Sequence, residues 1–586
     1  MLNLPDLFLF PAPQSVTAAE GTAAADAPVS ERVDPADRGR KESFRLTVRG
    51  DGVDLVAHDE AGLFYGREAL RQLRLGAPQR LPCGEIVDHP DLAVRGYMLD
   101  CSRDRVPSMA FLRDTLIPRL GRLRVNHLEL YTEHTIRYAG HEPAWKDASP
   151  FTFEELGEIQ RLCREHFIEL VPCQNLFGHM ERWLDLPAYH HLAEVDEGFE
   201  SPWGWRPGTC SLAPVLPEAF ELSADLIDQL CAASDATLFN IGCDETFDLG
   251  QGKSKEACER EGKAHVYLGY LKRLCARVSE RGKTPIYFGD IVLNHPELIA
   301  ELPPEGVLVN WNYESIKSFA PESERFQQAG VRFYVCPGTS SWCSLTGRGR
   351  NATDNQRDAA EAGIRFGAEG YLNTEWGDHG HWQTQAVSWV GLVFGSGVAW
   401  CLRTNGDTDA LPRAISRVAA DEEDPGLGAI LWDLANAYES SDARWHNATW
   451  WFRFLHAPEL PIAEEPLARL STADTDAGEA ALDAVLGRLG SVETRTEEAA
   501  LLVREAAFSA ALARWSCRRA GERLRGGDAG AGPAMRAELE GLAAEHRALW
   551  AIRSRPGGLE DSVRKLEKPL RVTGADAGAV RTSGNF

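Results

Sequence analysis

Two neighbouring carboxylates are the residues of this sequence best placed to do chemistry. Asp244 and Glu245 directly follow the apolar run 238–243, which ends in small residues. Such a short run predicts a buried parallel strand, so the pair lies where that strand ends. Aspartate and glutamate total 87 of 586 residues, and the same pair also occurs in polar or turn-like surroundings, at Asp59, Asp196 and Asp421. Ionised carboxylates beside a buried strand are costly unless they have a function, which favours a catalytic pair.

Further acidic, polar and aromatic residues follow other predicted strands in the same way. In chain order they are Asp100, Tyr131, Glu133, Gln174, Asp290, Trp311, Tyr313, Trp342, Trp376 and Asp378. Acids bind hydroxyl groups and move protons, whereas flat aromatic rings stack on the C–H faces of a pyranose. For one tryptophan alone, packing in the core is the more ordinary interpretation. Three of them together at strand ends favour a site for sugars.

Short apolar runs alternate with helical patterns through the middle of the chain. The runs are 94–100, 125–131, 168–175, 237–243, 284–290, 306–313, 331–338 and 370–378, and amphipathic segments such as 107–122, 153–166, 256–281 and 352–365 lie between them. Eight strands alternating with helices predict the α/β class and a (β/α)8 TIM barrel, whose active site gathers at the C-terminal ends of the strands. A doubly wound open sheet is the alternative, but no glycine-rich GxGxxG turn follows the first run.

Regions with other patterns of apolar residues flank this predicted barrel of residues 91–405. Residues 1–90 predict a small α+β domain, with a hairpin around Gly50-Asp51-Gly52 followed by a helical pattern over 62–75. Residues 406–586 predict a helical domain, because apolar residues recur there at spacings of three and four. We expect its apolar stripes to pack on the barrel rather than on a second subunit, and the tail from Thr573 to be frayed.

The composition limits the partners. A net charge of −25 argues against nucleic acid and anionic membranes, and 44% hydrophobic with 25% charged residues is typical of a soluble globular protein. The first residues lack the pattern of a signal peptide, and no stretch is apolar enough to span a membrane. The 13 cysteines are scattered, with no CxxC pair and no zinc-ligand spacing. We therefore expect buried thiols, a cytoplasmic protein and no metal.

The strand-end motifs, taken together, resemble glycoside hydrolase family 20, the β-N-acetylhexosaminidases. The segments that carry the resemblance are RGYMLDCSRDRVPSMAFLRDTL, NHLELYTEH, NIGCDETFDLG and NTEWGD. The family signature is a strand-end Gly-x-Asp-Glu, usually with a second glycine, where this chain has Cys243. The segment GLFYGREALRQL is similar to the small domain that precedes the barrel in this family. The resemblance covers roughly residues 44–400 and is greatest to a bacterial, cytoplasmic-type branch.

The resemblance implies unequal roles for the two acids. Family 20 is an exception to two-carboxylate catalysis, because the 2-acetamido oxygen of the substrate attacks the anomeric carbon and forms an oxazolinium ion. Glu245 would be the general acid/base, and Asp244 would polarise the acetamido group. Asp244 must then stay ionised while Glu245 starts protonated. Adjacent carboxylates favour that division, because ionising one raises the pKa of the other.

The resemblance also implies residues that bind the sugar. Arg95 would grip the 3- and 4-hydroxyls, since the planar guanidinium suits a diol. Trp376 and Asp378 match a Trp-Gly-acid motif, with the ring in the pocket wall and the acid on the 4- or 6-hydroxyl. The remaining candidates are Tyr313 for the acetamido carbonyl, Trp311 and Trp342 for the acetamido pocket, His179 as support for the acid pair, and Glu133, where many family members carry aspartate.

The expected activity is the exo-acting, retaining removal of terminal β-linked GlcNAc or GalNAc without a cofactor. The expected partner is a glycan or glycoconjugate, and a homodimer is a further expectation. Two alternatives stay open at this point. The barrel could use two-carboxylate chemistry on other β-glycosides, for which Asp290 would be the second acid, or it could be a carbohydrate-binding protein without catalysis.

Overall fold

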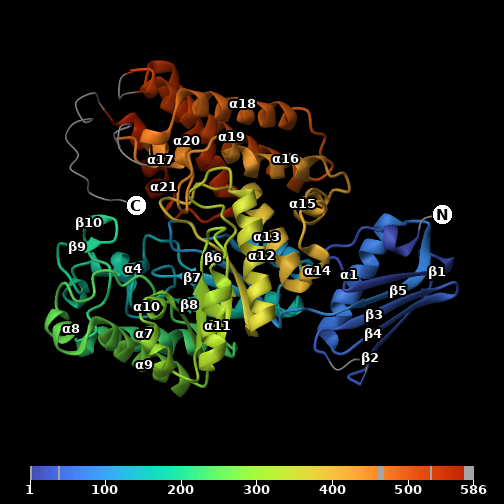
Figure 1. Ribbon diagram of the computed structural model, residues 1–586, viewed down its shortest axis with the longest axis horizontal. Coiled ribbons are helices and arrows are strands. Elements are labelled where there is room, and N and C mark those ends of the chain that lie inside the picture. Colours follow the sequence, from blue (N-terminus) through green and yellow to red (C-terminus); the bar gives the residue numbers. More distant parts are fainter. Residues whose placement is uncertain (1–2, 37–39, 460–466, 528–530, 573–586) are drawn as a thin grey trace.

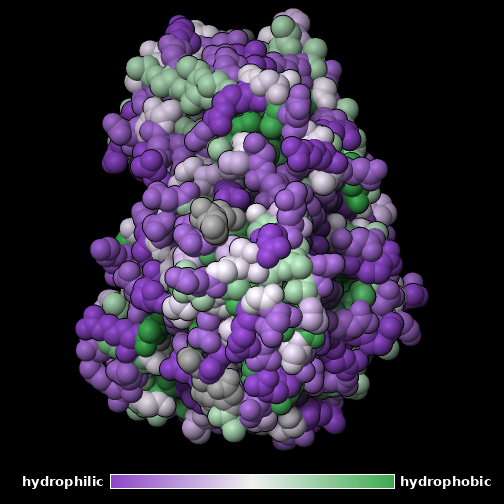
Figure 2. All heavy atoms as spheres, turned by 90° about the vertical axis from the view of Figure 1, so that its right-hand side faces the viewer, coloured by the Kyte–Doolittle hydropathy of each residue, from purple (hydrophilic) through white to green (hydrophobic). Residues whose placement is uncertain are grey.

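The computed structural model describes residues 3–36, 40–459, 467–527 and 531–572. Figure 1 shows a small N-terminal sheet beside a central barrel, with a layer of C-terminal helices covering one end of the barrel. The predicted frayed tail from Thr573 lies outside the described residues. Figure 2 shows one face covered mainly by hydrophilic residues, with hydrophobic ones scattered among them. In the part of the chain that the structure describes, no helix combines the length and apolarity needed to cross a bilayer.

The central sheet closes into a barrel of eight parallel strands. These are β6 (Val94–Asp100), β7 (His127–Thr132), β8 (Glu169–Gln174), β11 (Leu238–Asn240), β12 (Thr284–Phe288), β13 (Val307–Trp311), β14 (Phe333–Cys336) and β15 (Gly370–Glu375). Each lies within or one residue beyond one of the predicted apolar runs, and β15 closes the ring by pairing with β6. The predicted TIM barrel is confirmed.

Helices surround the barrel where the amphipathic segments predict them. The main ones are α5 (Phe153–Glu165), α7 (Pro217–Ala233), α9 (Lys263–Glu280), α11 (Phe319–Ala329), α12 (Gly349–Phe366) and α13 (Gln385–Trp400). The segment 256–281 is not one helix, because Gly262 has φ +91° and separates α8 (Lys255–Glu261) from α9. The segment 107–122 contains α2 (Met109–Phe111), a π-helical turn (Leu112–Leu116) and α3 (Ile117–Arg122).

The N-terminal region is a five-stranded sheet with one helix. The hairpin of β3 (Phe44–Arg49) and β4 (Gly52–Ala57), the helix α1 (Glu60–Gly76) and the strand β5 (Arg80–Asp88) form its centre. The sequence did not predict the edge strands β1 (Ser15–Ala24) and β2 (Val29–Val33). Both are mostly exposed along their length, so they lack the apolar alternation by which a half-buried strand is recognised.

Arg95 belongs to the junction between this sheet and the barrel, not to the sugar site. Its side chain is 1% exposed at the start of β6, with Nη2 at 2.5 Å from Glu42 Oε2. The guanidinium also donates to the carbonyl oxygens of Leu92, Ala93 and Arg124 and lies 4.9 Å from the centroid of the Trp400 ring. The prediction that Arg95 binds substrate is therefore wrong, because the site gathers at the opposite ends of the strands.

The C-terminal helices pack on the barrel, as predicted. They are α15 (Leu411–Ala419), α16 (Gly426–Asn436), α17 (Trp450–His456), α18 (Thr472–Leu489), α19 (Glu497–Leu524), α20 (Pro533–Arg553) and α21 (Leu559–Leu566). Polar contacts join the two parts, including Thr384 Oγ1 to Ser509 Oγ at 3.1 Å and Trp382 Nε1 to the Ser562 carbonyl at 3.2 Å. The domain boundaries at residues 90 and 405 stay predictions.

Replacing Arg95 tests its structural role. Arg95→Ala leaves the Glu42 carboxylate without its buried partner, and breaking such a pair typically costs about 3–5 kcal/mol. We expect the free energy of unfolding in denaturant to fall accordingly, while KM of the folded fraction stays near the wild-type value. Arg32→Ala is the control, because Arg32 is 54% exposed in its pair with Asp54 and such a surface pair contributes about 0–1 kcal/mol. If Arg95→Ala left the free energy of unfolding unchanged and greatly raised KM, Arg95 would instead be a residue that binds the sugar.

Candidate active site

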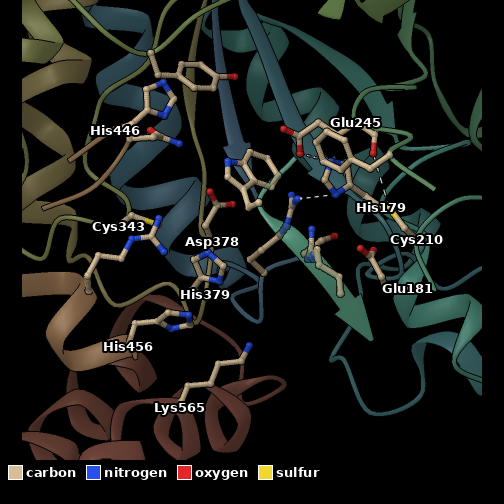
Figure 3. A pocket seen from close by; sticks show the side chains of 18 of the residues that line it. His179, Glu181, Cys210, Glu245, Cys343, Asp378, His379, His446, His456 and Lys565 are labelled. Atoms are coloured by element: carbon tan, nitrogen blue, oxygen red, sulfur yellow. Dashed lines mark hydrogen bonds and ion pairs between the residues drawn. The ribbon is translucent and has the colours of Figure 1, made fainter. Parts of the chain in front are cut away.

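A cavity of about 880 Å³ opens at the C-terminal ends of the barrel strands. Its wall has two parts: residues of the strand-end loops, and residues of the C-terminal helical region (Figure 3). Six predicted site residues line it: Glu133, His179, Glu245, Trp311, Tyr313 and Asp378. Asp244 lies next to this wall, with its side chain only 8% exposed.

The acid pair sits on a strained turn directly after β11. Gly242, Cys243 and Glu245 all have left-handed backbone angles, with φ of +66°, +73° and +52°. Such angles cost of order 1–3 kcal/mol for a residue other than glycine, and they persist only where the surroundings enforce them. Tyr267 does so here by donating its hydroxyl to the Cys243 carbonyl at 2.8 Å. The second glycine usual at position 243 would relieve strain at this point.

Asp244 is held in the ionised state. Its Oδ1 accepts a hydrogen bond from Asn175 Nδ2 at 2.7 Å, and its Oδ2 lies 3.4 Å from His179 Nε2. Burial alone would raise the pKa of Asp244, but the charge and hydrogen bond of His179, together with Asn175, outweigh it and lower that pKa below its usual value. A carboxylate kept ionised and buried suits the role of polarising a neighbouring group.

His179 joins the two acids through one nitrogen. Its Nε2 lies 3.4 Å from Asp244 Oδ2 and 3.4 Å from Glu245 Oε2, while Nδ1 lies 3.3 Å from Arg103 Nη2. A carboxylate can only accept, so Nε2 carries a proton toward the two acids. Burial lowers the pKa of His179, but the two carboxylates reverse the shift and raise it well above the usual value. The predicted support of the pair by His179 agrees with this geometry.

Asp290 lies behind Glu245. Its Oδ2 accepts a hydrogen bond from the Glu245 amide at 3.1 Å. Burial, together with the charges of Asp244 and Glu245, raises the pKa of Asp290 to about 8, so its carboxyl is protonated at neutral pH. A protonated acid bound to the backbone of Glu245 is a poor candidate for a nucleophile, which disfavours the two-carboxylate alternative.

Aromatic side chains form one wall of the cavity. Trp311 stacks on Tyr313 with ring centroids 5.2 Å apart, and Trp376 Nε1 donates to the Tyr313 hydroxyl at 2.8 Å. Trp342 meets Tyr313 edge-on at 5.0 Å and is 1% exposed, so it packs behind this wall. Its predicted place in the pocket lining is corrected: close packing around Gly338 covers its ring. Trp376, predicted to lie in the pocket wall, is 7% exposed and lies outside the lining, where it supports Tyr313.

Two further acids in the cavity have raised pKa values. Burial raises the pKa of Asp378 to about 6 and that of Glu133 to about 7, although the charge of Arg103 opposes both rises. Arg103 lies 3.3 Å from Glu133 Oε1 and 5.0 Å from the Tyr131 ring centroid, and its Nη2 is 3.3 Å from His179 Nδ1. These groups can bind sugar hydroxyls from several sides.

The sequence reasoning missed Arg103, Asn175 and the C-terminal part of the wall. Arg103 follows the strand-end residue Asp100 by three positions, and Asn175 follows Gln174. Their positions just after predicted strands were therefore a signal that could have identified both residues. The C-terminal part of the wall, which includes Arg444, His446, Asn447, Arg453, His456, Lys565 and Lys568, had none. Within the described residues, no three or more His, Cys, Asp or Glu side chains are grouped to hold a metal ion.

Two family models match the chain. "Glycosyl hydrolase family 20, domain 2" matches residues 15–89, and "Glycosyl hydrolase family 20, catalytic domain" matches residues 93–362, which together exceed half of the chain. The chain belongs to glycoside hydrolase family 20. The N-terminal match explains why a small sheet precedes the barrel, and the second match contains the Asp244-Glu245 pair.

Relatives of this family-20 chain include hexosaminidase D from Homo sapiens, 28% identical over 35% of this chain and 42% of the relative. A beta-hexosaminidase from Akkermansia muciniphila is 22% identical over 44% of this chain and 57% of the relative. The chain thus spans about half the length of the curated relatives it matches. Among solved structures, a chitobiase from Flavobacterium johnsoniae has a TM-score of 0.59 at 16% identity, covering 97% of this chain and 100% of that one. The bacterial branch stays a prediction.

Removing His179 should change the pH dependence of the family-20 site. In His179→Asn the Asp244 pKa loses its largest lowering contribution, which leaves the hydrogen bonds from Asn175 and the backbone to oppose burial, so that pKa rises. Since the role expected of Asp244 requires its ionised form, we expect the acidic limb of kcat/KM to move to higher pH. A profile identical to wild type would contradict the assignment. His191→Asn is the control, because His191 is exposed and lies outside the cavity lining.

Asp290→Asn should stabilise the protein in a pH-dependent way. The folded pKa of about 8 exceeds the ordinary 3.8, so wild type loses stability as pH rises between these values, whereas asparagine carries no proton to lose. We expect Tm of the variant relative to wild type to rise from pH 4 to 8 and to level off above. Activity at pH 6 should be largely retained, since asparagine still accepts from the Glu245 amide. A Tm difference independent of pH would contradict the raised pKa.

Proposed function

We propose that this family-20 chain is an exo-acting, retaining β-N-acetylhexosaminidase that works by substrate-assisted catalysis. The observation that carries the proposal is the unequal setting of two adjacent acids. Asp244 is buried and ionised, while the Glu245 side chain is 29% exposed toward the cavity. One acid is thus suited to hold a charge beside the substrate, and the other to exchange protons with it.

In the proposed reaction, the substrate supplies the nucleophile. The acetamido oxygen attacks the anomeric carbon while Asp244 orients the acetamido N–H and balances the positive charge of the oxazolinium ion. Glu245 donates a proton to the departing glycosidic oxygen and then removes one from the attacking water. Two inversions at the anomeric carbon retain its configuration. The relatives named as hexosaminidases support this assignment.

The remaining contacts are proposed from the cavity wall. The Tyr313 oxygen accepts from Trp376 Nε1, which leaves its own proton for the acetamido carbonyl. Arg103 replaces Arg95 as the guanidinium for the ring hydroxyls, and Asp378 reaches a 4- or 6-hydroxyl. Trp311 offers a ring face at the same wall. The substrate would be a glycan that ends in a β-linked N-acetylhexosamine.

Two proposals concern the surroundings rather than the reaction. Eleven of the thirteen cysteines are buried and all are free thiols, which supports a reducing, cytoplasmic setting. A homodimer remains a proposal that sedimentation of the full chain tests directly.

Variants of the acid pair test the proposed reaction. With alkyl β-glycosides of GlcNAc and GalNAc, Glu245→Gln should lower kcat by roughly 10²–10⁴-fold, and with good aryl leaving groups the loss should be smaller, since these need little protonation. Asp244→Asn should slow both classes, because the acetamido group is then poorly oriented. The anomer released first, followed by NMR, should be β.

A thiazoline that mimics the oxazolinium ion should inhibit wild type competitively. The proposal fails if wild type cleaves neither sugar or ignores the thiazoline. Cleavage of β-glycosides that lack the acetamido group would instead favour the two-carboxylate alternative, and sugar binding without turnover would favour a carbohydrate-binding protein.

A further inference from the structure

A short hairpin at the cavity presents two tryptophans to solvent. It consists of β9 (Gly198–Ser201) and β10 (Gly204–Pro207), labelled beside α8 and α4 in Figure 1. Trp203 is 46% exposed and Trp205 is 47% exposed, and they are the exposed tryptophans among the described residues. Large exposed rings beside a cavity are typical of binding surfaces.

The two tryptophans differ in where they lie. Trp203 lines the cavity, together with Glu245 and Phe247. Trp205 does not line it, and its ring instead covers the backbone of Gly198 on the opposite strand, where an added Cβ would come within 2.6 Å of Trp205 Cζ2. The two tryptophans therefore differ in their position relative to the cavity and not in their exposed fraction.

Trp203 is tied to the loop that carries Glu245. Its ring meets Phe247 edge-on at 5.2 Å, and the Phe247 amide donates to the Glu245 carbonyl at 2.7 Å. Gln251 links the same loop to the hairpin, because its side-chain amide donates to the carbonyls of Glu200 and Phe247, both at 2.9 Å. The ring is thus held in a defined place relative to Glu245.

The tip of the hairpin is also fixed. Ser201 Oγ donates to the Gly204 carbonyl at 2.7 Å and accepts from the Trp203 amide at 3.2 Å. A turn closed by both bonds presents the indole without a large ordering cost on binding, which is the condition for a preformed platform.

We propose that Trp203 stacks on the sugar ring of the leaving group, directly beyond the bond that is cleaved. This rests on the proposed function, in which Glu245 protonates the glycosidic oxygen. The leaving group must therefore lie on the cavity side of Glu245, and Trp203 lines the same cavity. The C–H face of a pyranose suits an indole, and Arg206, Glu181 and Arg182 in the same lining offer partners for its hydroxyls. The natural substrate is then an oligosaccharide or glycan, cleaved in preference to glycosides of small alcohols.

The test compares two leaving groups that need similar protonation. The substrates are the methyl β-glycoside and a β-linked disaccharide of whichever N-acetylhexosamine wild type cleaves. Wild type should prefer the disaccharide in kcat/KM. In Trp203→Ala we expect kcat/KM for the disaccharide to fall roughly tenfold, and the value for the methyl glycoside to stay within about twofold. Trp203→Phe should recover most of the loss.

Trp205→Ala is the matched control, with the same side chain, exposure and hairpin, and it should leave the ratio of the two kcat/KM values unchanged. An equal fall for both substrates in Trp203→Ala would overturn the proposal, because it would assign the ring to support of Phe247 and Glu245. An unchanged ratio, or the same change in Trp205→Ala, would also overturn it. If wild type cleaves neither substrate, the proposed function itself fails, and this inference fails with it.

Discussion

Two adjacent carboxylates repel one another, and the site of this protein is arranged around that repulsion. One imidazole nitrogen, His179 Nε2, lies 3.4 Å from an oxygen of each acid. Asn175 stabilises the charge on Asp244, whereas Glu245 turns toward the cavity. Asp290 behind them stays protonated because burial, together with the charges of the neighbouring acids, raises its pKa. The turn after β11 that carries the two acids has left-handed backbone angles at Gly242, Cys243 and Glu245.

The barrel supplies the acids of the cavity, and the C-terminal helical region supplies cations. Among the lining residues, the part before residue 406 contributes Asp104, Glu133, Glu181, Glu245, Glu314 and Asp378 against three arginines. The part after it contributes Arg444, Arg453, Lys565 and Lys568 and no acid. Lys565 Nζ lies 2.6 Å from Asp104 Oδ2, so opposite charges also hold the two parts together. The helical region is therefore part of the site and more than a support for the barrel.

Arg95 and Arg103 show how direction along a strand decides function. Arg95 lies at the start of β6 and Arg103 lies just past its end; a strand of this length spans roughly 20 Å, so its two ends lie at opposite ends of the barrel. Arg95 precedes most of the strand and reaches Glu42 and Trp400, whereas Arg103 follows the strand and reaches His179 and Glu133. Resemblance within one motif could not choose between two arginines, although the rule that barrel sites gather at strand C-termini could have done so.

The sequence alone determined the barrel, the place of the acid pair and most of the polar residues around it. It could do so because apolar runs of strand length and the residues that end them are local patterns. The exposed edge strands β1 and β2 lack that pattern, and so does the cavity wall drawn from Arg444 to Lys568. Only the tertiary structure decided which strand-end residues meet, that Trp342 packs behind Tyr313, and that Trp203 lines the same cavity as Glu245. These depend on contacts between segments far apart in the chain, which no local pattern records.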